Sequence, residues 1–186
     1  DCRVDVAPRN DMVKVGVIGA GNYALATLLP ALSRTTATLA MVADINGVAA
    51  SYAARKYKAG RAVSDYHEIL NDPAIHAVFV LVGHHLHARF ICEVLASGKH
   101  VFVEKPLAIN EVQLEDVINA YSKINVDSRL RGNDIEGCGN DIKGRGNDKA
   151  NRMVQPFINV GFNRRFSPHT VKIRELLAAR TEPLTM

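Results

Sequence analysis

The residues best suited to do chemistry form the pattern Gly-x-Gly-x-x-Ala, which begins at Gly19 directly after an apolar, β-branched run. Where such a turn joins a strand to a helix, the first glycine allows the tight turn and the second lets the backbone approach a diphosphate. The diphosphate then lies at the positive N-terminus of the helix. The pattern therefore predicts dinucleotide binding, with an ordinary glycine-rich turn as the alternative. The residues expected to contact the cofactor here are Gly19, Gly21, Asn22, Tyr23 and Ala24.

A carboxylate follows at the distance that ribose recognition requires. Asp44 stands twenty residues after Ala24, at the end of the strand predicted over residues 38–43. At that place a carboxylate can accept hydrogen bonds from the adenosine ribose hydroxyls, and it repels a 2′-phosphate. Asp44 therefore favours NAD over NADP as the cofactor. The alternative is that Asp44 caps the next helix beside Asn46.

A charged pair, Glu104-Lys105, stands before Pro106 and after the strand predicted over residues 100–103. Open α/β sheets bind their ligands at the carboxyl ends of the strands. A lysine at this edge can donate to a substrate hydroxyl or carbonyl next to the nicotinamide, and it can shuttle a proton if it is partly desolvated. Lys105 is therefore the candidate catalytic residue. The alternative is an ordinary polar end of a strand.

A histidine cluster, His84-His85-Leu86-His87, opens a helix after another predicted strand. The cluster resembles a metal site, but its spacing does not place the rings on one helix face, and no acidic or cysteine partner lies nearby in the sequence. We therefore expect no metal. His87 is expected to contact the cofactor edge or the substrate, with an exposed helix cap as the alternative.

Alternating strands and helices must position these residues. The hydrophobic patterns predict strands over residues 13–18, 38–43, 62–63, 77–82, 100–103 and 157–162. They predict helices over residues 25–32, with Pro30 expected to kink or shorten the helix, and over 47–57, 65–70, 86–97, 110–121 and 168–180. Such units build a parallel sheet with helices on both faces. The predicted fold is therefore an α/β, doubly wound Rossmann domain over residues 12–121.

Residues 122–152 break this alternation. Gly132, Gly139 and Gly146 each begin a Gly-Asn-Asp triplet that recurs every seven residues. A heptad is typical of a coiled coil, but Gly-Asn-Asp favours turns, and each repeat holds one Ile at most. Because the segment buries too little apolar surface to offset the ordering of the chain, we predict a flexible, disordered insertion. Residues 153–186 then supply the last strand and a linking helix, which begins after the N-cap residue Ser167.

The composition excludes several classes of protein. The chain of 186 residues has 47% hydrophobic residues, 3 Cys and a formal net charge of +4, which excludes a disordered tail and a disulfide scaffold. The excess of basic residues lies in residues 151–186, so we expect no nucleic-acid partner. No apolar run is long enough to cross a membrane. The cysteines are far apart and indicate free thiols in a reducing compartment, which predicts a cytoplasmic protein.

Four longer motifs occur in order along the chain. They are Val-Gly-Val-Ile-Gly-Ala-Gly-Asn22, Asp65-Tyr66 with Leu70-Asn-Asp-Pro73, Gly-Lys-His-Val-Phe-Val-Glu-Lys-Pro106, and Val-Gly-Phe-Asn-Arg-Arg-Phe-Ser-Pro168. Together they resemble the glucose–fructose oxidoreductase/inositol dehydrogenase family, Gfo/Idh/MocA. The resemblance implies that Lys105 is the family's catalytic lysine, with Glu104 and Pro106 on the nicotinamide side. It also implies that Arg164 or Arg165 approaches the cofactor from the last strand.

The resemblance further implies a second domain that supplies the substrate pocket and a dimer face. The chain stops about where that domain would begin and starts at Asp1 rather than Met. We therefore expect the nucleotide-binding half of an NAD(P)-dependent oxidoreductase acting on a small-molecule sugar, polyol or related hydroxy compound. This half is expected to be catalytically incomplete alone and to form a homo-oligomer only with the second domain. The alternative is a non-catalytic dinucleotide-binding module, such as the product of a split gene.

Overall fold

The centre of the fold is a parallel sheet. The computed structural model describes residues 12–132, 155–162 and 167–178. The strands are β1 (Lys14–Ile18), β2 (Thr38–Ala43), β3 (Arg61–Val63), β4 (Ala77–Val80), β5 (His100–Glu104) and β6 (Ile158–Gly161). They form one 6-stranded sheet in the order β3-β2-β1-β4-β5-β6, and every neighbouring pair is parallel. The predicted α/β, doubly wound fold is confirmed.

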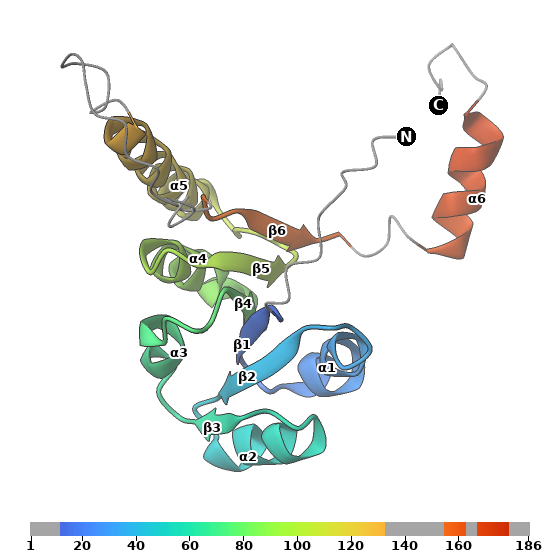
Figure 1. Cartoon of the computed structure of the whole chain (residues 1–186). Helices are drawn as coiled ribbons and strands as arrows, with labels where there is room; N and C mark the ends of the chain where they lie inside the picture. The colour runs from blue at the N-terminus through green and yellow to red at the C-terminus, as the bar shows by residue number, and fades with distance from the viewer. Residues whose placement is uncertain (1–11, 133–154, 163–166, 179–186) are drawn as a thin grey trace, which may run out of the picture.

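Helices cover both faces of this sheet (Figure 1). One face carries η1 (Ala24–Leu28), α1 (Leu29–Leu32) and α2 (Gly47–Lys56), and the other carries α3 (His67–Asn71), α4 (His87–Ala96) and α5 (Glu111–Gly132). Separate apolar clusters fill the two layers, one around Val17 and Leu29 and the other around Val80 and Ile91. No helix in the described residues is long and apolar enough to cross a membrane.

The helix after β1 changes its geometry next to Pro30. Proline has no backbone N–H to donate to the preceding turn. Just before it, η1 forms a π-helical turn, in which the Leu29 N–H donates to the carbonyl oxygen of Ala24. Pro30 then lies in the first turn of α1, where its missing N–H costs least. The predicted helix is therefore present, with the interruption expected of Pro30.

Helix α5 is longer than the sequence pattern predicts. The pattern predicts an end near Tyr121, but the helix runs to Gly132, so this predicted end is wrong. Val117 is buried, and Ala120, Tyr121 and Ile124 pack against the same apolar cluster. These positions continue the spacing i, i+3, i+4, i+7 of an amphipathic helix. The helix therefore enters the first repeat, and the rest of the predicted flexible insertion lies outside the described residues.

The last strand and helix form near their predicted positions. β6 pairs with β5 at the edge of the sheet. Helix α6 (Pro168–Leu177) begins after Ser167, whose hydroxyl oxygen accepts a hydrogen bond from the Thr170 N–H at 3.3 Å. Helix α6 has no buried residue and stands apart from the sheet in Figure 1.

Candidate cofactor site

The glycine loop after β1 combines one tight position with one open position. Gly19 has a φ of 101°, which glycine adopts without a steric penalty. A Cβ at Gly19 would lie 2.8 Å from the carbonyl carbon of Leu81, so the loop packs directly on the chain that follows β4. A Cβ at Gly21 would meet nothing within 4 Å. The space in front of Gly21 is therefore open, while Ala24 is buried beneath the turn.

Asp44 joins this loop to the end of β2. Its Oδ2 accepts a hydrogen bond from the Ala20 N–H at 2.7 Å, and its Oδ1 accepts one from the Asn46 N–H at 2.8 Å. The N-cap of α2 is Asn46, whose side chain accepts from the N–H groups of Val48 and Ala49. Asp44 is therefore not the helix cap, and its carboxylate is held beside the glycine loop.

A cavity of about 600 Å³ lies at the carboxyl ends of the central strands. Its walls come from the loops that follow β1, β2, β3 and β4 and from the start of α4. Strand order reverses here, because β1 lies between β2 and β4, and open α/β sheets bind ligands at such switch points. Gly19, Gly21 and Asp44 line this cavity, whose size is typical of cofactor sites.

The sequence interpretation missed several residues of this cavity. Ile45, Ser64, Asp65 and Tyr66 line it and follow β2 and β3 directly. The signal was present, because the first residues after each parallel strand all lie at the same edge of the sheet. Asp65 and Tyr66 belong to one of the four sequence motifs, but the motif alone assigns them no part in the site.

The cavity wall is acidic. Asp44 and Asp65 both line it, and among the described residues that form its wall none is Lys or Arg. The backbone N–H of His67 donates a hydrogen bond to Oδ1 of Asp65 at 2.9 Å. This bond is the main reason why the pKa of the Asp65 carboxyl group is lowered, and a second hydrogen bond from the His67 ring lowers it further. Asp65 is therefore ionised at neutral pH, and a negatively charged ligand group placed beside Asp44 and Asp65 is unfavourable.

The predicted catalytic segment leaves the sheet at the same edge. β5 includes Glu104, and the Tyr23 hydroxyl donates to Oε1 of Glu104 at 2.5 Å. Lys105 follows and is exposed, and the peptide bond between Lys105 and Pro106 is cis. The fold thus joins the glycine loop to the segment that carries Lys105.

Comparison with known proteins places this arrangement in a family. Residues 13–127, more than half of the chain, match the Gfo/Idh/MocA oxidoreductase family, which is described by an NAD-binding Rossmann fold. The chain belongs to this family. The resemblance inferred from the four sequence motifs is confirmed.

Three relatives show how far the similarity extends. An uncharacterized oxidoreductase of Rhizobium meliloti, ORF334, is 34% identical over 110 residues, which are 59% of this chain and 33% of that protein. The myo-inositol dehydrogenase from Lactobacillus casei, in complex with NAD(H) and myo-inositol, is 28% identical with a TM-score of 0.66, over 90% of this chain and 41% of that one. A 3-ketoreductase from Actinomadura kijaniata, in complex with NADP and TDP-benzene, is 28% identical with a TM-score of 0.56, over 60% of this chain and 34% of that one. This chain therefore spans less than half of each.

In this Gfo/Idh/MocA domain, His87 lies in a different environment from the one predicted. Its side chain is 0% exposed. Nδ1 lies 2.6 Å from the carbonyl oxygen of Pro106, and Nε2 lies 3.1 Å from that of Val82. A carbonyl oxygen only accepts, so a neutral ring donates to one of the two. The buried ring presents no surface to a cofactor or substrate, which corrects the expectation of a direct contact. His87 instead ties the chain after β4 to the turn that follows Lys105.

Among the described residues, the other candidate ligands form no metal site. In the part of the chain that the structure describes, no group of three or more His, Cys, Asp or Glu side chains is placed to hold a metal ion. Cys92 is a free thiol whose pKa is raised, chiefly by burial. Arg164 and Arg165 lie outside the described residues.

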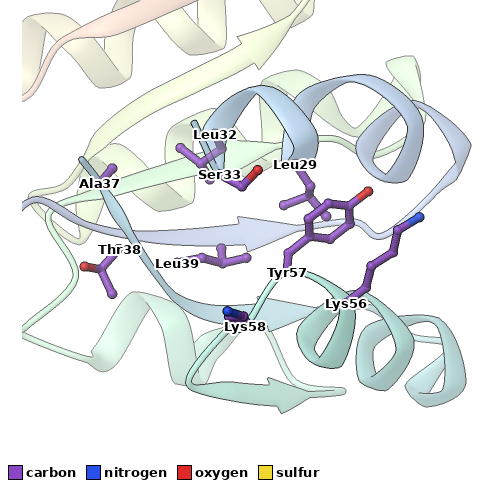
Figure 2. Close-up of a pocket in the computed structure, with 9 residues that line it drawn as sticks. All are labelled: Leu29, Leu32, Ser33, Ala37, Thr38, Leu39, Lys56, Tyr57 and Lys58. Carbon is purple, nitrogen blue, oxygen red and sulfur yellow. The ribbon is translucent and has the colours of Figure 1, made fainter. Parts of the chain in front are cut away.

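A second cavity, of about 520 Å³, lies at the opposite end of β2 (Figure 2). Residues from α1, the start of β2 and the end of α2 line it. Lys56 and Lys58 stand at the C-terminal end of α2, where cations offset the negative end of the helix dipole. The Tyr57 hydroxyl donates to the carbonyl oxygen of Leu25. The Lys56 ammonium lies over the rings of Tyr52 and Tyr57. The cavity lies at the amino ends of the strands, away from the switch point.

Proposed function

We propose that this chain binds NAD at the carboxyl edge of its sheet and forms the cofactor side of an oxidoreductase acting on a sugar, a polyol or a related hydroxy compound. One observation carries the proposal: Gly21 and Asp44 lie at the same loop. Gly21 faces open space, and the Asp44 carboxylate accepts a hydrogen bond from the Ala20 N–H of that loop at 2.7 Å. Relatives in complex with NAD(H) and myo-inositol, and with NADP, support a dinucleotide and a polyol-like substrate.

The residues of this edge fit such a cofactor. The open space before Gly21 admits a diphosphate, and the N-terminus of the following helix favours its negative charge. Asp44 accepts from the ribose hydroxyls, and Ile45, which is 97% exposed, offers an apolar surface to the adenine. When bound, a nicotinamide supplies hydride transfer, which no amino-acid side chain provides.

Lys105 is the group proposed to act on the substrate. It is exposed and directly follows β5, so its ammonium is accessible to a ligand at the carboxyl edge. A lysine in this place donates a hydrogen bond to the hydroxyl or carbonyl oxygen of the reacting carbon, and it takes up or returns the proton of that oxygen.

The acidic wall supports NAD rather than NADP. A 2′-phosphate on the adenosine ribose would approach the carboxylate of Asp44, with Asp65 in the same wall and no Lys or Arg among the described residues that line the cavity. Like charges repel each other, more strongly near a protein surface than in bulk water.

Binding of the two cofactors tests this assignment. Calorimetric titration should give a dissociation constant for NAD at least about tenfold below that for NADP, and Asp44→Ser should narrow the gap. Asp116→Ser, which removes an exposed carboxylate on α5, is the matched control and should leave the gap unchanged. Equal affinities of the unaltered chain for NAD and NADP would overturn the role of Asp44.

Turnover tests the assignment of Lys105. Because this half is expected to be catalytically incomplete alone, the chain should bind NAD without forming NADH from a panel of polyols and sugars. Any NADH formation that the unaltered chain does show should disappear in Lys105→Ala and persist in Lys123→Ala, a control on the exposed surface of α5. Turnover that survives in Lys105→Ala would refute the role of this lysine. Robust NADH formation that Lys105→Ala abolishes would refute the expectation of a catalytically incomplete half and would support the role of the lysine.

A further inference from the structure

We propose that Tyr23 and Gly161 are positioning residues, which together fix the Glu104 carboxylate as a hydrogen-bond acceptor for the nicotinamide half of the cofactor. The inference rests on the proposed function, because it assigns a role inside the same site. It concerns residues from three separate parts of the chain: the glycine loop, the end of β5 and the end of β6.

Tyr23 reaches Glu104 from the glycine loop. The two residues are 81 positions apart in the sequence, and the Tyr23 hydroxyl donates to Oε1 at 2.5 Å. A hydrogen bond to an ionised carboxylate is short and about twice as strong as one between neutral groups. The bond thus links the loop proposed to hold the diphosphate to the residue directly before Lys105.

Gly161 provides the room in which this carboxylate lies. Gly161 is the register partner of Glu104 on the neighbouring strand. A Cβ at Gly161 would lie 2.7 Å from Oε1 of Glu104 and 2.9 Å from its carboxyl carbon. Real Cβ atoms do not approach other heavy atoms so closely, so any larger residue at this position displaces the carboxylate. The side chain of Glu104 therefore lies flat against β6.

The fixed carboxylate has acceptor capacity left for a ligand. A carboxylate offers about four lone-pair sites, and the bond from Tyr23 uses one of them. Glu104 ends β5 at the carboxyl edge, while Asp44 directly follows β2 on the other side of the glycine loop. A dinucleotide with its ribose at Asp44 and its diphosphate at Gly21 extends toward Glu104, where ribose hydroxyls and a carboxamide are the available donors. Pre-positioning the acceptor lowers the ordering cost of binding.

The test compares two ligands of the full chain, NAD and ADP, since ADP lacks the nicotinamide half. The ratio of the ADP dissociation constant to the NAD dissociation constant measures what that half contributes. Tyr23→Phe keeps the ring and removes only the hydroxyl, and it should lower the ratio about tenfold. Gly161→Ala should act in the same direction. Tyr52→Phe, which alters an exposed tyrosine on α2, should leave the ratio as it is.

A double-mutant cycle tests whether Tyr23 acts through Glu104. Glu104→Ala should lower the ratio, and Tyr23→Phe should have no further effect on it in that background. The inference would be overturned if Tyr23→Phe still lowered the ratio in the Glu104→Ala background, or if Tyr23→Phe left the ratio of the parent chain unchanged. Both outcomes can be read even if Gly161→Ala fails to fold. A parent chain that binds NAD no better than ADP would overturn this inference alone. A parent chain that binds neither ligand would overturn the proposed function as well.

Discussion

Two neighbouring glycines should separate stability from binding when each is changed to alanine. At Gly19 the φ of 101° is unfavourable for any residue with a Cβ, which costs about 1–2 kcal/mol. The new methyl group would also overlap the carbonyl group of Leu81, and crowding of this kind costs about 1–3 kcal/mol more. Gly19→Ala should therefore lower the free energy of unfolding by about 3 kcal/mol, which shifts the melting temperature by about 10 °C in a chain of this size.

Gly21→Ala should behave in the opposite way. Its Cβ would meet nothing within 4 Å, and its φ is not in the positive range, so the free energy of unfolding should change by less than about 1 kcal/mol. The methyl group would nevertheless occupy the space proposed for the diphosphate. We expect the dissociation constant for NAD to rise at least about tenfold.

Urea unfolding followed by circular dichroism, and calorimetric titration with NAD, measure the two quantities on the same protein samples. Each variant serves as the control for the other. If Gly21→Ala binds NAD as tightly as the parent chain, the diphosphate does not lie in front of Gly21. If Gly19→Ala is as stable as the parent chain, the contact between the glycine loop and Leu81 is not as close as described.

Two further predictions concern a half-buried histidine, His100, and a fully buried one, His87. The pKa of His100 is lowered, mainly by burial and secondly by nearby His76. The neutral ring therefore contributes fully to the free energy of unfolding above the ordinary value of 6.5, and this contribution is lost as the pH falls through the lowered pKa. His100→Gln should flatten that part of the profile of unfolding free energy against pH, and an unchanged slope would contradict this. His87→Leu should cost about 1–3 kcal/mol of stability, because it removes the ring that donates to the carbonyl oxygen of Pro106 or of Val82 and leaves that oxygen without its donor. The exposed control His85→Leu should cost little, and equal losses in the two variants would show that the buried contacts of His87 do not matter.

The predictable part of the fold is the part that local sequence determines. The strand before Gly19 and the strand before Asp44 are runs of apolar, mostly β-branched or long aliphatic residues. Gly19, which adopts a positive φ, follows the first run, and the charged residue Asp44 follows the second. Because parallel strands in such a sheet are covered on both faces, their apolar runs are nearly continuous and easy to recognise. The order of these strands then follows from the short right-handed connections between them.

Long-range contacts explain what the sequence did not predict. The bond between Tyr23 and Glu104 joins residues 81 positions apart, and no local pattern marks Gly161 as the place where that carboxylate lies. The burial of His87 likewise depends on the turn at Pro106, 19 positions later. The end of α5 was misplaced for a different reason. The apolar spacing of the helix continues past Tyr121 to Ile124, which indicates a longer helix. The Gly-Asn-Asp repeat, which is typical of turns, favours an earlier end.

The proposed binding site for NAD lies at the carboxyl edge of the sheet, between the glycine loop, Asp44 and Asp65. The most direct test is a titration of the isotopically labelled chain with NAD, followed residue by residue through its amide resonances. The amides of Gly19, Gly21 and Asp44 should shift together with a single dissociation constant, while those of Lys56 and Lys58 at the opposite cavity should not move. Shifts confined to Lys56 and Lys58, or no shifts at saturating NAD, would contradict the account.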